Sequence, residues 1–199
     1  RQSRSTCALP TTRQQCSNVP EKHPRPWDAT QTMHAAEVPW GDRSYWQRIL
    51  EIEQRSFSQP WRMEDFQLLA HDERALHVGL WRGSELTGYA LGYVGAEKAE
   101  LYLASLAVDE GHRRQGWGGF LLSEILTRAH ARSCEVCNLE VRASNIAAQN
   151  LYQKFGFEVS GTQPRFYTDP VEDAVLMKCP LAPSVQAETT PAPEVALDG

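Results

Sequence analysis

The sequence predicts one domain of the α/β (α+β) class, in which helices cover both faces of a mixed central β-sheet. Two observations predict this class. Segments with the period of a helix and segments with the period of a strand follow one another in the order helix, helix, β, β, β, α, β, α, β, β. In addition, 41% of the 199 residues are hydrophobic, which is enough for one substantial core.

The first part of the domain is expected to form two helices, a hairpin and a further strand. Trp46, Ile49 and Leu50 lie on one face of a helix, and a break at residues 58–60 precedes a second helix. Alternating apolar residues around a turn at 82–85 then indicate a β-hairpin. The expected helices cover 44–54 and 63–70, and the expected strands cover 76–80, 86–94 and 100–108. The last strand is almost continuously apolar, which is typical of burial on both faces.

The second part is expected to add two helices and three strands. Trp117, Leu121, Ile125 and Ala129 recur at helical spacing and predict a core-packing helix. Gly156 lies where a glycine commonly follows the end of a helix. The remaining expected elements are a strand over 136–141, a helix over 145–155, and a strand pair over 157–161 and 174–179.

Two segments outside this domain are expected to be disordered tails. Residues 1–31 and 182–199 are rich in polar residues and proline without an apolar period, which leaves 32–181 as the folded domain. No stretch approaches the roughly 18 to 20 apolar residues of a membrane span, and the first residues lack the apolar centre of a signal peptide. The net charge of −5 disfavours nucleic-acid binding. We therefore expect a cytoplasmic protein without membrane or nucleic-acid partners.

The five cysteines predict a reducing environment, because their number is odd and Cys7 and Cys16 lie in an expected tail. Cys134 and Cys137 have the spacing of a redox motif or half a zinc site, but no second pair or histidine cluster completes four ligands. We favour Cys137 as a small apolar residue that opens a buried strand, and expect no metal. The histidines expected at the surface are His71, His77, His112 and His130.

A glycine-rich turn between the third strand and the next helix carries the first functional signal. It consists of Arg113, Arg114, Gln115, Gly116, Trp117, Gly118 and Gly119. Backbone N–H groups at a helix start lack intrahelical partners and favour anions, so the turn predicts phosphate binding. It lacks the Gly-Lys-Ser/Thr of nucleoside triphosphatases and the third glycine of dinucleotide-binding turns. A turn that only packs a strand against a helix remains the alternative.

The turn and the segment 139–157 together resemble a known family. Arg/Gln-x-x-Gly-x-Gly/Ala at a strand-to-helix turn, followed by Asn-x-x-Ala-x-x-Leu-Tyr-x-x-x-Gly-Phe, is the pattern of the GNAT superfamily of N-acetyltransferases. Within it the chain is most similar to the RimI group, which acetylates the N-terminal alanine of a small-subunit ribosomal protein. This similarity covers about residues 45–181 and rests on Ile52-Glu53-Gln54, Phe57, Pro60, Trp61, Leu139 to Asn145, Phe166-Tyr167 and Glu172-Asp173-Ala174.

The resemblance implies a GNAT fold and acetyl-CoA as the acetyl donor. It implies that backbone groups of Leu106, Ala107 and Val108 contact the thioester and pantetheine, and that the turn holds the pyrophosphate. It also implies that Asn145 contacts the cofactor where the strands separate. Equally, Asn145 can cap the following helix, because asparagine is a preferred N-cap residue.

The resemblance also implies two residues that transfer protons. Glu140 is similar to the family's general base, which takes a proton from the amine directly or through water, and Tyr152 to the general acid that protonates the leaving thiolate. A glutamate in an apolar strand is unfavourable to bury without a partner or a cleft, which favours a functional role for Glu140. Core packing of Tyr152 remains an alternative, because Leu151 and Phe155 are close in sequence.

Residues 165–167 resemble the family's substrate-binding loop, in which aromatic side chains line the peptide entrance. The family usually has Tyr-Tyr where this chain has Phe166 and Tyr167, so one hydroxyl is absent. The implied reaction is direct transfer of acetyl from acetyl-CoA to the N-terminal α-amine of a protein, with alanine of a ribosomal protein as acceptor. We also expect the enzyme to be a monomer. Direct attack is favoured because no Cys or Ser has an evident base partner. Two alternatives stay open: transfer to a small amine or a lysine side chain, and a non-catalytic acyl-CoA-binding module.

Overall fold

The computed structural model describes residues 33–39, 43–95 and 99–181 of the chain. Its strands are β1 (Met33–Ala36), β2 (Ala75–Arg82), β3 (Glu85–Val94), β4 (Glu100–Val108), β5 (Val136–Arg142), β6 (Glu158–Thr168) and β7 (Val171–Pro180). Its helices are α1 (Arg43–Ser56), α2 (Met63–Ala70), the short 3₁₀ helix η2 (Glu110–His112), α3 (Trp117–Ala131) and α4 (Ile146–Lys154). The expected tails, 1–31 and 182–199, lie outside the described residues.

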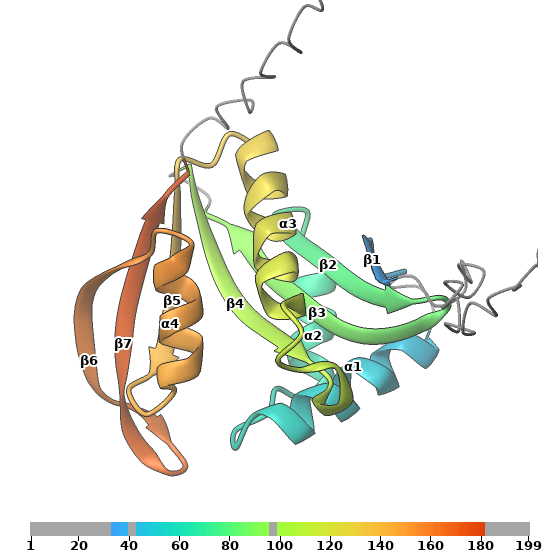
Figure 1. Cartoon of the computed structure of the whole chain (residues 1–199), viewed down its shortest axis with the longest axis horizontal. Coiled ribbons are helices and arrows are strands. Elements are labelled where there is room, and N and C mark those ends of the chain that lie inside the picture. Colours follow the sequence, from blue (N-terminus) through green and yellow to red (C-terminus); the bar gives the residue numbers. More distant parts are fainter. Residues whose placement is uncertain (1–32, 40–42, 96–98, 182–199) are drawn as a thin grey trace, which may run out of the picture.

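One mixed sheet of seven strands runs through the molecule in the order β1-β2-β3-β4-β5-β7-β6. Neighbouring strands are antiparallel except for β4 and β5, which are parallel. Helices lie on both faces of this sheet (Figure 1), so the predicted fold class is confirmed. Within the described ranges, no helix combines the length and apolar character that a bilayer-spanning segment requires.

The expected helices and strands are present, and the differences concern the two ends of the sheet and the short helix η2, which was not predicted. β1 was not predicted, because its four residues, Met-His-Ala-Ala, are too few for a periodic pattern. β6 and β7 extend to 11 and 10 residues, well beyond the predicted strands. Most of β6 is exposed on both sides, so it carries no apolar alternation. Residues 165–167 therefore belong to β6, and the expectation of a loop there is wrong.

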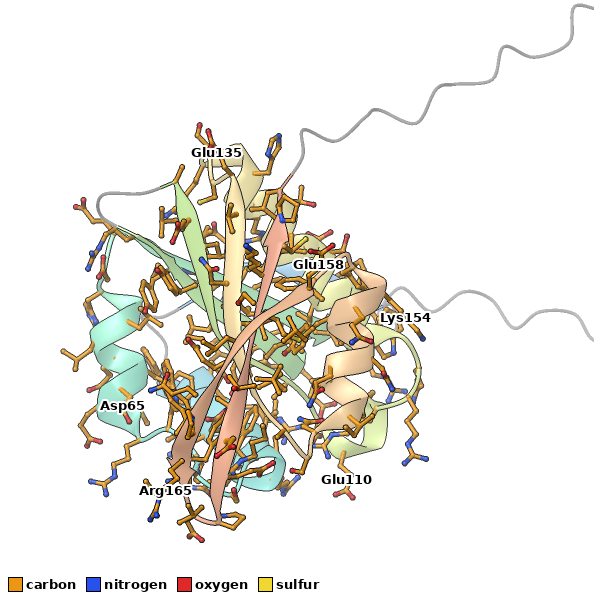
Figure 2. The ribbon with its side chains drawn as sticks, turned by 90° about the vertical axis from the view of Figure 1, so that its left-hand side faces the viewer. Asp65, Glu110, Glu135, Lys154, Glu158 and Arg165 are labelled. Carbon is orange, nitrogen blue, oxygen red and sulfur yellow. The ribbon has the colours of Figure 1, made fainter. Side chains whose placement is uncertain are left out.

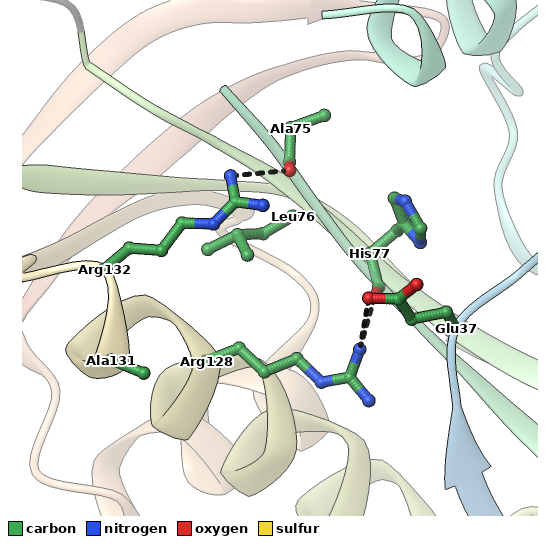
Figure 3. Close-up of a pocket in the computed structure, with 7 residues that line it drawn as sticks. All are labelled: Glu37, Ala75, Leu76, His77, Arg128, Ala131 and Arg132. Atoms are coloured by element: carbon green, nitrogen blue, oxygen red, sulfur yellow. Dashed lines mark hydrogen bonds and ion pairs between the residues drawn. The ribbon is translucent and has the colours of Figure 1, made fainter. Parts of the chain in front are cut away.

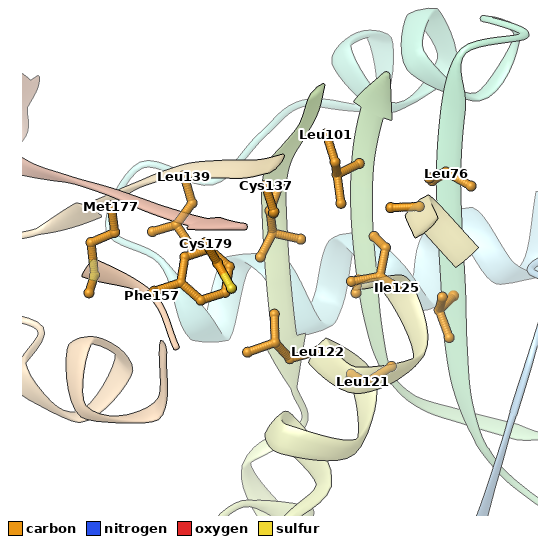
Figure 4. Packing of buried hydrophobic residues seen from close by; sticks show 14 of the residues in the cluster. Leu76, Leu101, Leu121, Leu122, Ile125, Cys137, Leu139, Phe157, Met177 and Cys179 are labelled. Carbon is orange, nitrogen blue, oxygen red and sulfur yellow. The ribbon is translucent and has the colours of Figure 1, made fainter. Parts of the chain in front are cut away.

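Two clusters of buried apolar residues hold the helices on the sheet. On one face, Leu121 and Ile125 of α3 belong to the same cluster as Leu139 of β5, and α4 packs against this cluster (Figure 4). On the other face, Ile49 of α1 and Phe66 of α2 form the second cluster with side chains of β3. Full burial of a large apolar side chain contributes about 1.5 to 3 kcal/mol. This packing fixes α1 and α2 on one face, and α3 and α4 on the other.

β4 and β5 pair over only three residues and then separate. Glu100 to Tyr102 pair with Val136 to Asn138, whereas β3 follows β4 as far as Val108 and β7 follows β5 as far as Arg142. Among the described strands, none pairs with the β5-facing edge of β4 beyond Tyr102. Backbone groups at such an edge need other partners, so the opening is a candidate binding site.

A bulge in β4 coincides with this separation. Leu91 pairs with Ser105 and Gly92 pairs with Leu103, so Ala104 is an extra residue in β4. A bulged strand bends and twists more strongly than a regular one. Gly92 permits the close contact of the strands, since a Cβ at this position would lie 2.6 Å from the Tyr102 carbonyl oxygen. The bend begins where pairing with β5 ends, and so contributes to the opening.

Candidate active site

The opening between β4 and β5 holds a pocket of about 200 Å³. β4, β5, α4, β6, the end of α1 and the segment that follows α1 build its wall. Figure 2 shows Glu110 and Arg165 at one end of the molecule and Glu135 at the other, and the pocket lies toward the first end, because the second halves of β4 and β5 line it. The pocket brings together five residues that the sequence predicted to act here: Leu106, Glu140, Asn145, Tyr152 and Tyr167.

The three predicted residues of β4 lie at its open edge. Leu106, Ala107 and Val108 pair with β3 on one side, and the opposite side faces the opening. Leu106 is half-buried and lines the pocket, whereas Ala107 and Val108 are buried. This edge can offer backbone groups to an extended ligand, as the sequence predicted for pantetheine.

The glycine-rich turn leads from η2 into α3. Gly116 is the N-cap residue, with a φ of 88° and no side-chain cap. The first helical hydrogen bond runs from the Phe120 amide to the Gly116 carbonyl at 3.1 Å. The amides of residues 116–119 are therefore those that a helix start leaves unpaired, and they can bind an anion such as a pyrophosphate.

Two glycines of the turn, Gly118 and Gly119, allow the start of α3 to pack closely against α4. A Cβ on Gly118 would lie 3.5 Å from Leu151, and one on Gly119 would lie 3.4 Å from the Phe155 ring. The start of α3 thus packs closely against α4, as the packing interpretation of the turn expected. A Cβ on Gly116 would meet nothing within 4 Å, so the positive φ rather than space requires glycine there.

The other residues of the turn have different surroundings. Arg113 Nε donates to the Val108 carbonyl and its Nη2 to Ser56 Oγ, both at 2.8 Å, so this side chain joins the turn to α1. Arg114 is exposed, with a φ of 60°, and is the better placed of the two guanidinium groups for a phosphate. The Gln115 side chain donates to the Gly111 carbonyl at 3.3 Å, and Trp117 packs edge-on against Phe120.

Glu140 and Tyr152 reach the pocket from opposite faces of the sheet. Leu139 and Val141 belong to the apolar cluster under α3 and α4, so the alternation of β5 turns Glu140 toward the face of α1. Tyr152 comes from α4, on the other face. Both residues line the pocket, and Glu140 is exposed in it. A molecule bound between them can meet a carboxylate on one side and a phenol on the other.

The ring of Tyr152 packs in the core while the residue also borders the pocket. It contacts the Phe157 ring at a centroid distance of 5.6 Å within the cluster under α4. Burial raises the pKa of the Tyr152 hydroxyl. The hydroxyl therefore stays protonated at neutral pH, which a proton donor requires.

Residues 46–157 of the chain match the Acetyltransferase (GNAT) family. The chain belongs to this GNAT family. It is 35% identical to the [ribosomal protein bS18]-alanine N-acetyltransferase of Escherichia coli (strain K12). This similarity extends over 133 residues, which are 66% of this chain and 88% of that protein. The crystal structure of the ribosomal-protein-S18-alanine N-acetyltransferase from Escherichia coli has a TM-score of 0.68 at 29% identity, over 78% of this chain and 98% of that one. Ard1 from Thermoplasma volcanium shares the fold, with a TM-score of 0.69 at 22% identity over 76% of this chain and 99% of that one.

As a GNAT protein of the RimI type, the enzyme is an acetyl-CoA-dependent N-acetyltransferase. The family and the GNAT fold that the sequence motifs implied are thus confirmed.

In this GNAT enzyme, Asn145 caps α4. Its Oδ1 accepts a hydrogen bond from the Ala148 amide at 3.1 Å, which is the geometry of an N-cap. The capping alternative is confirmed. Because Asn145 also lines the pocket, its contact with the cofactor remains a prediction.

The two adjacent aromatic residues of β6, Phe166 and Tyr167, lie in different environments. Tyr167 lines the pocket, and burial raises the pKa of its hydroxyl. Phe166 is 42% exposed and packs edge-on against Tyr167 at 5.0 Å. The pairing with β7 is irregular between Gln163 and Tyr167, and Arg165 has a φ of 53°. This bulge turns neighbouring side chains in different directions, and only Tyr167 of the pair lines the pocket.

Glu53 lines the pocket, although the sequence predicted no role for it. Its side chain is only 1% exposed. The Trp61 amide donates to Oε1 at 3.0 Å, and the hydroxyls of Tyr89 and Ser105 donate to Oε2. Burial raises the pKa of this carboxyl group above its ordinary value. A signal existed in the sequence, because residue 53 continues the apolar stripe of Trp46 and Ile49 at helical spacing.

The four histidines predicted at the surface differ in exposure. His71 is exposed, and His77, His112 and His130 are partly buried. Burial lowers the pKa of His77 to about 4. In the described ranges, no group of three or more His, Cys, Asp or Glu side chains is placed to hold a metal ion.

The cysteines of the folded domain are free thiols inside the protein. Cys134, Cys137 and Cys179 are all buried. Cys137 belongs to the apolar cluster under α3 and α4, as predicted for a small apolar residue in a buried strand. Cys7 and Cys16 lie outside the described residues.

Arg128 and Arg132 line a second pocket, of about 340 Å³, between α3 and β2 (Figure 3). Nη1 of Arg128 donates to the His77 carbonyl and Nη1 of Arg132 to the Ala75 carbonyl, both at 3.2 Å. β1 pairs with β2 only over Gly79 to Arg82. The two arginines thus cover the part of the β2 edge that β1 leaves open, and covering an edge protects it from unwanted pairing. The arginines that line this pocket are therefore explained by their structural role at the edge of β2.

Proposed function

We propose that this GNAT enzyme acetylates the N-terminal α-amine of a protein, with the N-terminal alanine of a ribosomal protein as acceptor. The observation that carries the proposal is the position of Glu140 and Tyr152 on opposite sides of one pocket at the open edge of β4. The similarity to the bS18-alanine N-acetyltransferase of Escherichia coli supports the choice of acceptor. A ribosomal acceptor also favours the cytoplasm as the site of action.

The residues around the pocket fit acetyl-CoA. The open edge of β4 offers backbone groups for an extended chain, and residues 116–119 offer amides at a helix start for a pyrophosphate. When bound, acetyl-CoA supplies the thioester, whose carbonyl carbon forms the new C–N bond as the C–S bond breaks. No acyl-enzyme is required, because the amine attacks directly.

The two proton transfers fall to Glu140 and Tyr152. Glu140 takes a proton from the α-ammonium group, directly or through water, so that the nitrogen lone pair becomes free to attack. Tyr152, which its raised pKa keeps protonated, gives its proton to the departing sulfur. An α-amine has an unperturbed pKa of about 7.7 to 8.0, against about 10.4 for lysine. A carboxylate base is therefore better suited to an N-terminus than to a lysine side chain.

Peptide acetylation with purified enzyme tests the acceptor. Peptides beginning with Ala, Ser, Met or Gly are incubated with acetyl-CoA, release of coenzyme A is followed, and the acetylated position is mapped by mass spectrometry. The control peptide has a blocked N-terminus and an internal lysine. We expect acetylation of the α-amine, with alanine preferred. Modification of lysine alone, or of small amines alone, would replace the proposed acceptor, and absence of turnover with every amine would favour an acyl-CoA-binding module.

A further inference from the structure

We propose that Arg142 is a positioning residue that holds the substrate side of the pocket in its binding shape. It does so by joining the α1–α2 segment (residues 57–62) to the hairpin of β6 and β7. The inference rests on the proposed function, since both parts line the pocket on the side of Glu140, where the peptide would enter. Arg142 ends β5 and lies two residues after Glu140, on the same face of the strand. Its side chain is only 18% exposed.

The Arg142 guanidinium group donates hydrogen bonds to both parts at once. Toward the α1–α2 segment, Nη2 donates to Ser58 Oγ at 2.9 Å and to Gln59 Oε1 at 3.2 Å. Toward the hairpin, Nη2 donates to the Asp169 carbonyl at 2.9 Å, and Nη1 donates to the Pro170 carbonyl at 3.2 Å. A planar guanidinium with five N–H donors can serve partners on two sides, whereas a lysine ammonium cannot reproduce this geometry.

The same group orients an aromatic side chain of the pocket. The central carbon of the Arg142 guanidinium lies 4.1 Å from the centroid of the Tyr167 ring. A cation over a tyrosine ring is attracted to it, most strongly when the pair is shielded from water. Tyr167 lines the pocket, so Arg142 acts on the shape of the pocket through this ring.

The two parts also form direct hydrogen bonds with each other, but these bonds are exposed to water and do not hold the parts together without a further partner. Gln59 Nε2 donates to Thr168 Oγ1 at 2.6 Å, and the Thr168 amide donates to Gln59 Oε1 at 3.1 Å. Ser58 Oγ also donates to the Asp169 carbonyl at 2.9 Å. These residues are exposed and more than 100 positions apart in sequence, so water competes for each bond. Arg142 lies between the two parts and bonds to both.

Glu172 extends this network toward α4. Its Oε1 accepts a hydrogen bond from the Ser144 amide, and its Oε2 accepts one from Arg142 Nη1 at 3.1 Å. Bonds from Ser144, and then from Arg142, hold the pKa of Glu172 below its ordinary value. Ser144 directly precedes the N-cap residue of α4, the helix that carries Tyr152. The network therefore connects both walls of the pocket.

Kinetics of Arg142→Lys test the role of Arg142 with the peptide that the wild-type enzyme acetylates. We expect KM for the peptide to rise about 10- to 100-fold, the effect of losing hydrogen bonds to a charged group that hold the binding residues in place, while KM for acetyl-CoA stays within about twofold. Arg132→Lys is the matched control, since its guanidinium also donates to backbone carbonyls, but in the second pocket. Both KM values should stay unchanged in that control. Equal rises in both KM values of Arg142→Lys would overturn the proposal.

A double-mutant cycle with Gln59→Ala tests whether the two residues act together. Gln59→Ala alone should also raise KM for the peptide. In the double variant, the combined rise should be clearly smaller than the product of the two single rises, as for residues of one network. Independent effects, in which the two factors multiply, would contradict the inference even if Arg142→Lys alone is poorly active.

Hydrogen exchange in the free enzyme separates this inference from the proposed function. Arg142→Lys should increase the exchange rates of the amides in 57–62 and 168–172 about tenfold or more, with exchange in α3 unchanged. Unchanged exchange in both segments would overturn the inference whatever the acceptor is. A wild-type enzyme that does not acetylate α-amines would instead overturn the proposed function, and the exchange result would still decide the role of Arg142.

Discussion

The hydroxyl of Tyr89 donates a hydrogen bond to the carboxylate of Glu53 inside the protein. The same carboxylate accepts bonds from the Ser105 hydroxyl at 3.3 Å and the Trp61 amide at 3.0 Å. One buried acid thereby joins α1 to β3, β4 and the α1–α2 segment. A carboxylate is tolerated in such a place because donors surround it, and its titration has a measurable effect on stability.

Glu53→Gln is expected to change how stability depends on pH. Burial, opposed by the bonds from Trp61, Tyr89 and Ser105, raises the pKa of Glu53 above its ordinary value of 4.5. The folded protein therefore holds this proton more tightly than the unfolded chain does. The stability that the group contributes is complete below about pH 4.5 and is lost as the pH rises through the folded-state pKa.

Glutamine does not titrate, so the free energy of unfolding of Glu53→Gln should improve relative to wild type between about pH 4.5 and about pH 7. Urea unfolding across this range measures the difference. Glu158→Gln, at an exposed glutamate of β6, is the control and should lack this Glu53-dependent trend. A difference between Glu53→Gln and wild type that is constant with pH would contradict the assignment.

Glu140→Gln is expected to lower kcat about 10²- to 10⁴-fold at neutral pH, the usual contribution of a general base. The deficit should shrink above about pH 8, because the α-amine of the peptide then loses its proton to water. Tyr152→Phe should lower kcat without this recovery, since the leaving thiolate still lacks a proton donor. Initial rates from pH 6 to about pH 9 decide between these outcomes, with Glu158→Gln as control. Parallel pH profiles for the two variants would refute the separate roles.

Gly116→Ala is expected to weaken acetyl-CoA binding and to destabilise the fold by about 1 to 2 kcal/mol, because alanine is strained at a φ of 88°. Gly111→Ala is the matched control. A Cβ would meet nothing within 4 Å at either position, and Gly111 is not among the residues with positive φ. The measurements are KM for acetyl-CoA and thermal unfolding. Similar behaviour of the two variants would argue against the left-handed cap at Gly116.

Leu121→Ala is expected to reduce the free energy of unfolding by about 2 to 5 kcal/mol, the range for large core residues cut back to alanine. Leu121 lies on the buried face of α3 and is fully buried. Leu68→Ala removes the same atoms from a side chain that is 77% exposed, and should change stability by no more than about 0.5 kcal/mol. Denaturant unfolding of both variants gives the comparison. Equal losses would mean that α3 does not pack as described.

The sequence predicted those features that depend on neighbours along the chain. Apolar periodicity located the helices and most strands, and the spacing around Gly116, Glu140 and Tyr152 indicated the family. Contacts between distant segments carried no such local signal. Arg142 could be placed on a strand, but its partners Ser58 and Asp169 are far away in sequence. The full length of β6 could not be predicted from the sequence for a different reason, because an exposed strand needs no alternation of apolar residues.

The separation of β4 from β5 divides recognition between two kinds of chemistry. Along β4 the groups on offer belong to the main chain, and every residue type except proline carries the same pair of them. On the substrate side the groups belong to side chains, among them Tyr167 and Gln59. Under the proposed binding mode, sequence changes there are expected to redirect which amine is modified, while the surface proposed for the acetyl donor stays intact. The scaffold is therefore suited to redesign of its specificity, one wall at a time.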